Sequence, residues 1–179
     1  MKTLTLLRHA KSGWDDEVQR DFDRPLNAKG HRAAQVVGRN LRRQEQRFDH
    51  VLASPALRVR ETLDEVRAGY GSDLAPAWDK RVYLASAATL LDLVRELDDA
   101  HASVLLVGHN PGLEDLVLLL TPDAPEGPRG DVEEKYPTAS VAELSLPIDH
   151  WADAAEGAAT LTRFTRPRDL DPSLGPDAG

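Results

Sequence analysis

The chain of 179 residues contains no cysteine, one methionine and only 5% aromatic residues. Without cysteine it can form neither a disulfide bond nor a thiolate metal site. It also cannot attack a substrate through a thiolate, because the thiolate is the reactive form of cysteine. Every enzyme class that depends on a cysteine nucleophile is therefore excluded.

Long apolar runs are missing as well. No segment of the sequence approaches the roughly 18 apolar residues that are typical of a membrane span. Met1 is followed by Lys2 and a short strand-like run, not by the apolar core of a signal peptide. We therefore expect a cytoplasmic protein with no membrane partner.

Positive charge is scarce in the chain as a whole. Twenty-two Lys and Arg residues face 30 Asp and Glu residues, which gives a formal net charge of −8. Nonspecific binding to nucleic acid depends on neutralising phosphates with cations, so we expect no nucleic-acid partner. An anionic substrate would need a local basic pocket.

The composition that is present is that of a globular domain. Hydrophobic residues make up 41% and charged residues 29% of the sequence, which is enough for a continuous core at this length. We expect a single domain over residues 1–168. Residues 169–179 lack a periodic apolar face and are predicted to be a flexible C-terminal tail.

Hydrophobic periodicity predicts strands and helices in alternation. Strands are expected near residues 3–8, 49–53, 82–84, 102–107, 140–146 and 159–164, and helices near residues 28–43, 55–67, 86–98 and 113–120. Ser54 is expected to cap the second helix, with Pro55 at its first position. Residues 121–136, with three prolines and two glycines, are expected to form a surface loop. This order predicts an α/β layer fold with a mostly parallel sheet.

Polar residues that suit phosphate chemistry follow three of the predicted strands. Arg8 and His9 end the first strand, Arg58 lies early in the helix after the second, and His109 follows the strand at 102–107. Sites in such sheets form at the carboxyl ends of the strands. Guanidinium groups match phosphate oxygens, and a neutral imidazole can attack phosphorus to give a phosphohistidine. These residues therefore predict a site for phosphoryl transfer.

The motifs around these residues resemble the histidine phosphatase superfamily, which includes cofactor-dependent phosphoglycerate mutases, and within it the SixA-like phosphohistidine phosphatases. The resemblance rests on LRHAKS at 7–12, SPALRVRET at 54–62 and VGHNPGLEDL at 107–116. DFDRPLNAKG at 21–30 and KYPTAS at 135–140 are also similar to SixA-type segments. Together these motifs extend the resemblance over essentially the whole predicted domain.

The resemblance implies a three-layer α/β/α sandwich and a role for each matched residue. His9 would be the nucleophile, and Arg8, Arg58 and His109 would bind and stabilise the phosphoryl group. It also implies no cofactor and no metal requirement. Arg24, in the fourth motif, is either a structural ion-pair partner of the Asp-rich loop or a substrate-binding residue.

Many relatives supply an acid that protonates the leaving oxygen, and here the nearest candidate is Asp79, whose surroundings match the motif poorly. An alkoxide needs such a proton, whereas a phosphorylated imidazole can leave already protonated. We therefore expect a phosphorylated protein carrying phosphohistidine as the substrate. A small phosphorylated metabolite, cleaved by a phosphomonoesterase or used by a phosphoglycerate mutase, is the alternative partner.

Two further readings stay open at this stage. Asp21 and Asp23 form a DxD pair, which would suit a magnesium-dependent phosphatase with an aspartyl nucleophile, but no hydrophobic strand precedes the pair. The chain could also be a binding module that reads phosphate without turnover. Against this, both histidines and both arginines of the motifs are present. The remaining histidines have no spacing typical of a zinc site.

Overall fold

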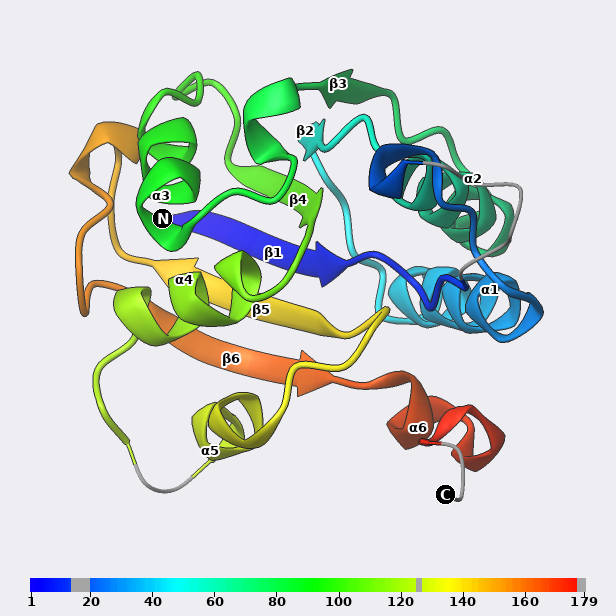
Figure 1. Ribbon diagram of the computed structural model, residues 1–179. Helices are drawn as coiled ribbons and strands as arrows, with labels where there is room; N and C mark the ends of the chain where they lie inside the picture. The colour runs from blue at the N-terminus through cyan, green and yellow to red at the C-terminus, as the bar shows by residue number, and fades with distance from the viewer. Residues whose placement is uncertain (14–19, 125–126, 177–179) are drawn as a thin grey trace.

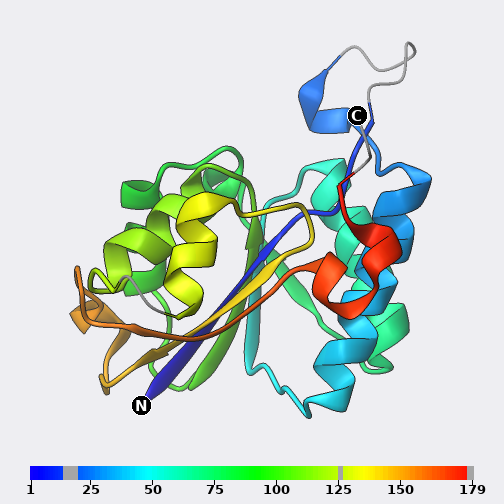
Figure 2. The same cartoon turned by 90° about the horizontal axis from the view of Figure 1, so that it is seen from below.

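The computed structural model describes residues 1–13, 20–124 and 127–176. It confirms the predicted α/β sandwich: a central sheet of six strands, in the order β3-β2-β4-β1-β5-β6, carries helices on both faces (Figure 1). Strands β1 to β4 are mutually parallel, while β5 runs antiparallel to both β1 and β6. Seen from below, α1, α2 and α6 cover one face, and α3, α4 and α5 cover the other (Figure 2).

The strands and helices have the following bounds. The strands are β1 (Lys2–Arg8), β2 (His50–Ala53), β3 (Pro76–Trp78), β4 (Ser103–Gly108), β5 (Val141–Leu146) and β6 (Thr160–Thr165). The α-helices are α1 (Ala28–Arg43), α2 (Leu57–Tyr70), α3 (Ala87–Arg95), α4 (Gly112–Leu120), α5 (Pro128–Glu134) and α6 (Pro167–Leu170). Short 3-10 turns are η1 (Asp21–Asp23), η2 (Lys80–Val82), η3 (Trp151–Asp153) and η4 (Pro172–Leu174).

The central strands are apolar because both of their faces are covered. In β1, Leu4 and Leu6 pack into the core on the α3–α4 side, whereas Leu7 packs into the core on the α1–α2 side. All three side chains are fully buried. The pairing of β1 with β4 runs from Thr3 opposite Ser103 to Arg8 opposite Gly108, so the chain leaves the sheet at Arg8.

Glycine lets α1 approach that exit point closely. A Cβ atom built at Gly30 would lie 2.1 Å from the carbonyl oxygen of Lys11. Asn27 caps α1 by accepting a hydrogen bond from Gly30 N, and its own N–H donates to Lys11 O. The start of α1 therefore holds the segment that follows His9.

The strand predicted at 82–84 is wrong. The chain pairs with β2 earlier, at Pro76–Trp78, and then turns through η2. Asp79 closes this turn, because its side chain accepts a hydrogen bond from Arg81 N and its carbonyl accepts one from Val82 N. Val82 is buried in this turn. One buried apolar residue between more polar neighbours gives the same sequence pattern as a short strand.

Two other expectations differ from the structure. Ser54 does not cap α2, which begins at Leu57 after Ala56, and its hydroxyl instead contacts His109. The segment 121–136 is not all loop, because α5 lies within it, with Pro128 at its start and Val132 buried. A helix of seven residues with one buried side chain shows too little apolar periodicity to detect in the sequence.

Part of the predicted flexible tail is ordered against the domain. Pro172–Leu174 form the turn η4, Leu174 is buried, and Lys29 donates a hydrogen bond to Gly175 O. Residues 177–179 lie outside the described residues, and the boundary at 168 stays a prediction. In the described part of the chain, no helix is long and apolar enough to cross a membrane.

Candidate active site

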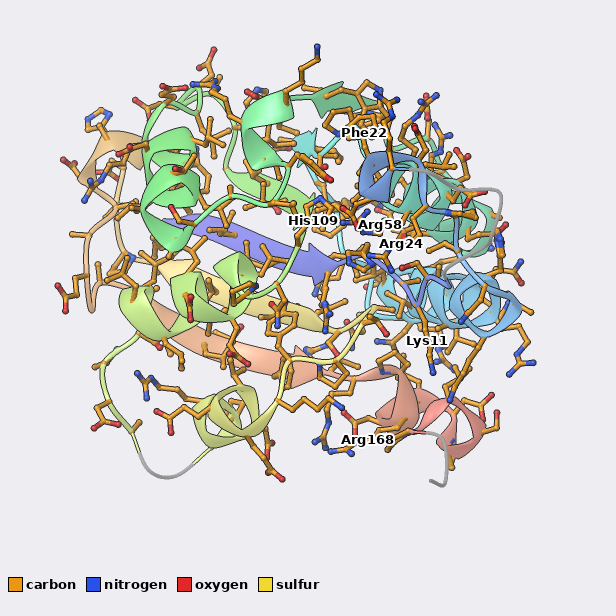
Figure 3. All side chains as sticks on the ribbon, in the orientation of Figure 1. Lys11, Phe22, Arg24, Arg58, His109 and Arg168 are labelled. Carbon is orange, nitrogen blue, oxygen red and sulfur yellow. The ribbon has the colours of Figure 1, made fainter. Side chains whose placement is uncertain are left out.

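Four of the predicted site residues, Arg8, His9, Arg58 and His109, meet at the carboxyl ends of neighbouring parallel strands. His9 follows β1 and His109 follows β4, and Arg8 pairs in register with Gly108, so the two rings lie with centroids 5.4 Å apart. Arg58 enters from the first turn of α2, the helix after β2. Figure 3 shows Arg58 and His109 converging with Arg24 beyond the end of β1.

His9 is held in one orientation by its neighbours. Its side chain is 6% exposed, and its Nδ1 lies 2.8 Å from the carbonyl oxygen of Ala10. A carbonyl can only accept, so Nδ1 carries the proton and Nε2 keeps its lone pair. The backbone N–H of Ala10 donates to Thr62 Oγ1, which in turn donates to Arg58 O, so the loop after β1 is fixed to α2.

The electrostatic surroundings keep His9 neutral. Burial lowers the pKa of His9 to about 3, and the nearby charges of Arg8 and Arg58 act in the same direction. At neutral pH the ring is therefore uncharged, with an unprotonated nitrogen beside cationic groups that attract an anion. That is the form in which an imidazole can attack phosphorus.

His109 has the opposite tautomer. Arg58 Nη2 donates to its Nδ1 over 3.2 Å, and since a guanidinium cannot accept, the proton sits on Nε2, which lies 2.8 Å from Ser54 Oγ. Burial and the charge of Arg58 lower the pKa of His109 to about 3. Two neutral imidazoles thus face each other across the site.

The two arginines from the motifs are fixed through backbone carbonyls. Arg8 Nη1 donates to Tyr136 O over 2.8 Å, and Arg58 Nη1 donates to Asp21 O over 2.8 Å. Arg58 is only 2% exposed. Burial lowers the pKa of Arg8. A guanidinium nonetheless keeps its positive charge in proteins and suits the binding of phosphate oxygens.

Asp21, which the sequence indicates only as half of a DxD pair, lies in the lining of the site. Its Oδ2 accepts hydrogen bonds from Arg58 Nη2 (3.0 Å) and from the hydroxyl of Tyr83 (2.6 Å), and its Oδ1 accepts one from Arg24 Nη2 (3.0 Å). Burial would raise the pKa of Asp21, but the hydrogen bond from Tyr83 and the charge of Arg58 outweigh it and hold the pKa at about 2. Asp21 is therefore a permanent anion that orients two arginines. The partner Tyr83 is 62 residues away in the chain, a contact that no local pattern reveals.

Asp79 is not brought together with the other predicted residues. Its carboxylate pairs with Arg81 over 2.8 Å, and this hydrogen bond lowers the pKa of Asp79. From the same loop, Leu84 lines the pocket, and its side chain is 57% exposed. The backbone of Leu84 has a φ of 51°. A left-handed backbone conformation is uncommon for leucine, and such strain is often kept at functional sites.

His9, His109 and the arginines around them line a pocket of about 360 Å³. Its lining is Arg8, His9, Lys11, Ser12, Asp21, Arg24, Arg58, Leu84, His109, Asn110 and Thr138. Four cations and one carboxylate give this lining a positive charge in a protein whose net charge is −8. Arg24 lies in the pocket, bound both to Asp21 and to Ser12 Oγ, so its two predicted roles are compatible. Among the described residues, no three or more His, Asp or Glu side chains are grouped to hold a metal ion.

Comparisons with known proteins relate the chain to histidine phosphatases. A model described as the histidine phosphatase superfamily (branch 1) matches residues 4–81. An uncharacterized protein of Mycobacterium tuberculosis is 36% identical over 166 residues, covering 90% of this chain and 100% of its own. The phosphohistidine phosphatase SixA of Escherichia coli is 27% identical over 149 residues, covering 79% of this chain and 83% of its own.

Solved structures show the same fold. A SixA protein from Nakamurella multipartitia has a TM-score of 0.81 and 29% identity, over 93% of this chain and 96% of that one. The protein histidine phosphatase SixA complexed with tungstate has a TM-score of 0.72 and 24% identity, over 94% and 99% of the two chains. The mycobacterial glucosyl-3-phosphoglycerate phosphatase, with a TM-score of 0.61 and 17% identity over 90% and 97%, shares the fold.

Proposed function

Since this chain belongs to the histidine phosphatase superfamily and is a phosphatase of SixA type, we propose that it transfers the phosphoryl group of its substrate to His9 and then hydrolyses the phosphohistidine. The observation that carries this proposal is the contact of 2.8 Å between His9 Nδ1 and the carbonyl oxygen of Ala10. The Nδ1 proton is committed to Ala10 O, so Nε2 is an available nucleophile inside a cationic pocket.

In the first step, Nε2 of His9 forms a bond to phosphorus while the bond from phosphorus to the leaving group breaks. The ring becomes positively charged, and the Ala10 carbonyl stabilises it through the Nδ1 proton. Arg8 and Arg58 bind the phosphoryl oxygens and His109 adds a third contact, so positioning and charge supply most of the catalysis. In the second step, water attacks phosphorus and releases inorganic phosphate and neutral His9.

The substrate that this site favours is protein phosphohistidine. Among the described residues that line the pocket, the single carboxyl group is Asp21, whose pKa of about 2 leaves it without a proton to give. An alkoxide leaving group needs that proton, whereas a phosphorylated imidazole can leave as a neutral, protonated ring. The loop after β3 contributes Leu84 to the lining of the pocket, and this side chain has no proton to donate. Relatives named phosphohistidine phosphatases support the same choice.

The proposal is tested by offering a phosphohistidine peptide and a phosphoserine peptide of the same sequence, with EDTA present, to the wild type, His9→Ala and His150→Ala. General acid catalysis contributes roughly 10²–10⁴-fold, so we expect kcat/KM for phosphohistidine to exceed that for phosphoserine by at least about 100-fold after correction for spontaneous hydrolysis. His9→Ala is expected to lose turnover. His150, which is exposed, is the matched control and should leave turnover unchanged.

Three outcomes contradict parts of the proposal. Turnover that survives in His9→Ala refutes the nucleophile. Equal kcat/KM for the two peptides refutes the phosphohistidine preference and favours a phosphomonoesterase. Loss of wild-type turnover in EDTA, restored by magnesium, refutes metal independence.

A further inference from the structure

A second hollow of about 480 Å³ continues from the active-site pocket toward the C-terminal segment. We call it the basic groove; its lining is Arg8, Lys11, Lys29, Ala33, Lys135, Pro137, Thr138, Arg166, Pro167, Arg168, Leu174, Gly175 and Pro176. It shares Arg8, Lys11 and Thr138 with the pocket. Figure 3 shows Lys11 between the end of β1 and α1, and Arg168 on α6 on the same side of the molecule. A ligand in the groove would therefore adjoin a phosphoryl group bound at His9.

The described lining of the groove holds six cationic side chains and no carboxylate. Arg166 is paired with Asp169 over 3.0 Å, which reduces its contribution. Lys135 and Arg168 are exposed, and within residues 1–13, 20–124 and 127–176 neither forms an ion pair. Cations gathered in one concave surface raise the local positive potential, although the protein as a whole is acidic. The groove is thus built to attract anions.

Its walls are held in place by contacts that do not use the exposed cations. The side chain of Leu174 is 8% exposed and packs into the α1–α2 core. The carboxylate of Asp169 accepts hydrogen bonds from the backbone N–H and the guanidinium of Arg166, which fixes the start of α6. Pro137, Pro167 and Leu174 add apolar surface beside the charges. Side chains with a carboxylate head and an apolar stem match such a mixed lining.

Its size argues against a single small anion. A hollow of about 480 Å³ lies within the roughly 300–1,000 Å³ of pockets that hold drug-sized ligands, far more than one phosphate group fills. We propose that the basic groove binds an acidic segment of the phosphoprotein substrate, next to its phosphohistidine. This inference rests on the proposed function and adds to it a sequence preference. Substrates with Asp or Glu near the phosphorylated histidine would be selected by charge complementarity.

The test uses two phosphohistidine peptides that differ only in their flanking residues, Glu in one and Gln in the other. Arg168→Glu reverses one groove charge, and Arg43→Glu is the matched control, because Arg43 is exposed at the far end of α1, about 21 Å along the helix from Lys29. In the wild type we expect kcat/KM to be at least tenfold higher for the Glu peptide than for the Gln peptide, because the Glu peptide has the lower KM. Arg168→Glu should abolish this ratio, and Arg43→Glu should keep it.

Equal kcat/KM for the two peptides in the wild type overturns the inference, as does an equal loss of the ratio in both variants. If neither peptide is hydrolysed, the proposed function fails, and the groove is judged by binding alone. The affinity of an unphosphorylated Glu peptide for the protein is then measured by fluorescence anisotropy at low and high NaCl. The inference predicts binding that is at least tenfold weaker in Arg168→Glu and that weakens with salt. Equal affinity in the two proteins overturns it.

Discussion

At the scale of single residues, the site depends on which nitrogen of each histidine carries its proton. His9 and His109 lie in neighbouring positions, yet one donates through Nδ1 to a carbonyl and the other accepts through Nδ1 from Arg58. Burial is the largest cause of the low pKa of both rings. Neutrality, tautomer and position are thus set together by the packing around them.

The first prediction concerns these pKa values. Nitrogen-15 NMR of the imidazole rings, assigned with His9→Ala and His109→Ala, should show both rings neutral down to about pH 4, since each has a pKa of about 3. His150 should titrate above its ordinary 6.5, because the hydrogen bond to Asp99 raises its pKa. A histidine in unfolded chain takes up its proton near 6.5, so the free energy of unfolding should fall as the pH drops from 6.5 toward 3. Titration of His9 near pH 6.5 contradicts this account.

The second prediction concerns Asp21. Asp21→Asn removes the anion that orients Arg24 and Arg58. The same carboxylate accepts a hydrogen bond from the hydroxyl of Tyr83. We expect kcat/KM to fall by about 10- to 100-fold, which corresponds to roughly 1.4–2.7 kcal/mol of transition-state stabilisation. Asp23→Asn is the control in the same 3-10 turn, because Asp23 pairs with the exposed Arg20. Equal kcat/KM for the two variants would show that Asp21 is an ordinary loop residue.

At the scale of secondary-structure elements, the sequence predicts what local periodicity encodes. The apolar run of β1 and the helical spacing of α1 are both visible in the chain, and the structure gives them nearly the expected bounds. The sequence did not predict the strand β3, because three residues are too few to show an alternation of apolar and polar positions. It did not predict the helix α5, because one buried side chain gives no helical spacing. The sequence indicated Asp21 only as half of a DxD pair. Its contacts with Arg58 and Tyr83 were missed because these residues are 37 and 62 positions away.

The third prediction belongs to the loop between β3 and α3. Leu84→Glu places a carboxyl group on the rim of the pocket, and Leu84→Gln is the isosteric control for the same left-handed backbone position. A new general acid should raise kcat for the phosphoserine peptide by about tenfold over Leu84→Gln, and the gain should disappear as the pH rises and the Glu ionises. Turnover of phosphohistidine should respond much less. If Glu and Gln give the same kcat for phosphoserine, the missing acid is not what limits the site.

At the scale of the whole molecule, the sheet brings the predicted site residues together, and the folded chain places a cationic groove beside them. Parallel strands β1, β2 and β4 end at one edge, so motifs that are some 50 residues apart in sequence meet in one pocket. The motif order made His9, Arg8, Arg58 and His109 predictable as a group. The basic groove was not predictable, because α1, the segment after α5 and α6 meet only in the folded protein. A protein with a net charge of −8 therefore presents a cationic surface next to the pocket that contains His9.

The central claim is that the reaction passes through phosphorylated His9. The most direct test mixes the enzyme with an excess of phosphohistidine peptide, quenches at neutral or alkaline pH within milliseconds, because phosphohistidine is labile in acid, and locates the phosphate by peptide mass spectrometry. The account predicts a transient phosphoryl group on the His9 peptide of the wild type and none in His9→Ala. Phosphate found on Asp21, or full turnover with no phosphorylated enzyme at any time, would contradict it.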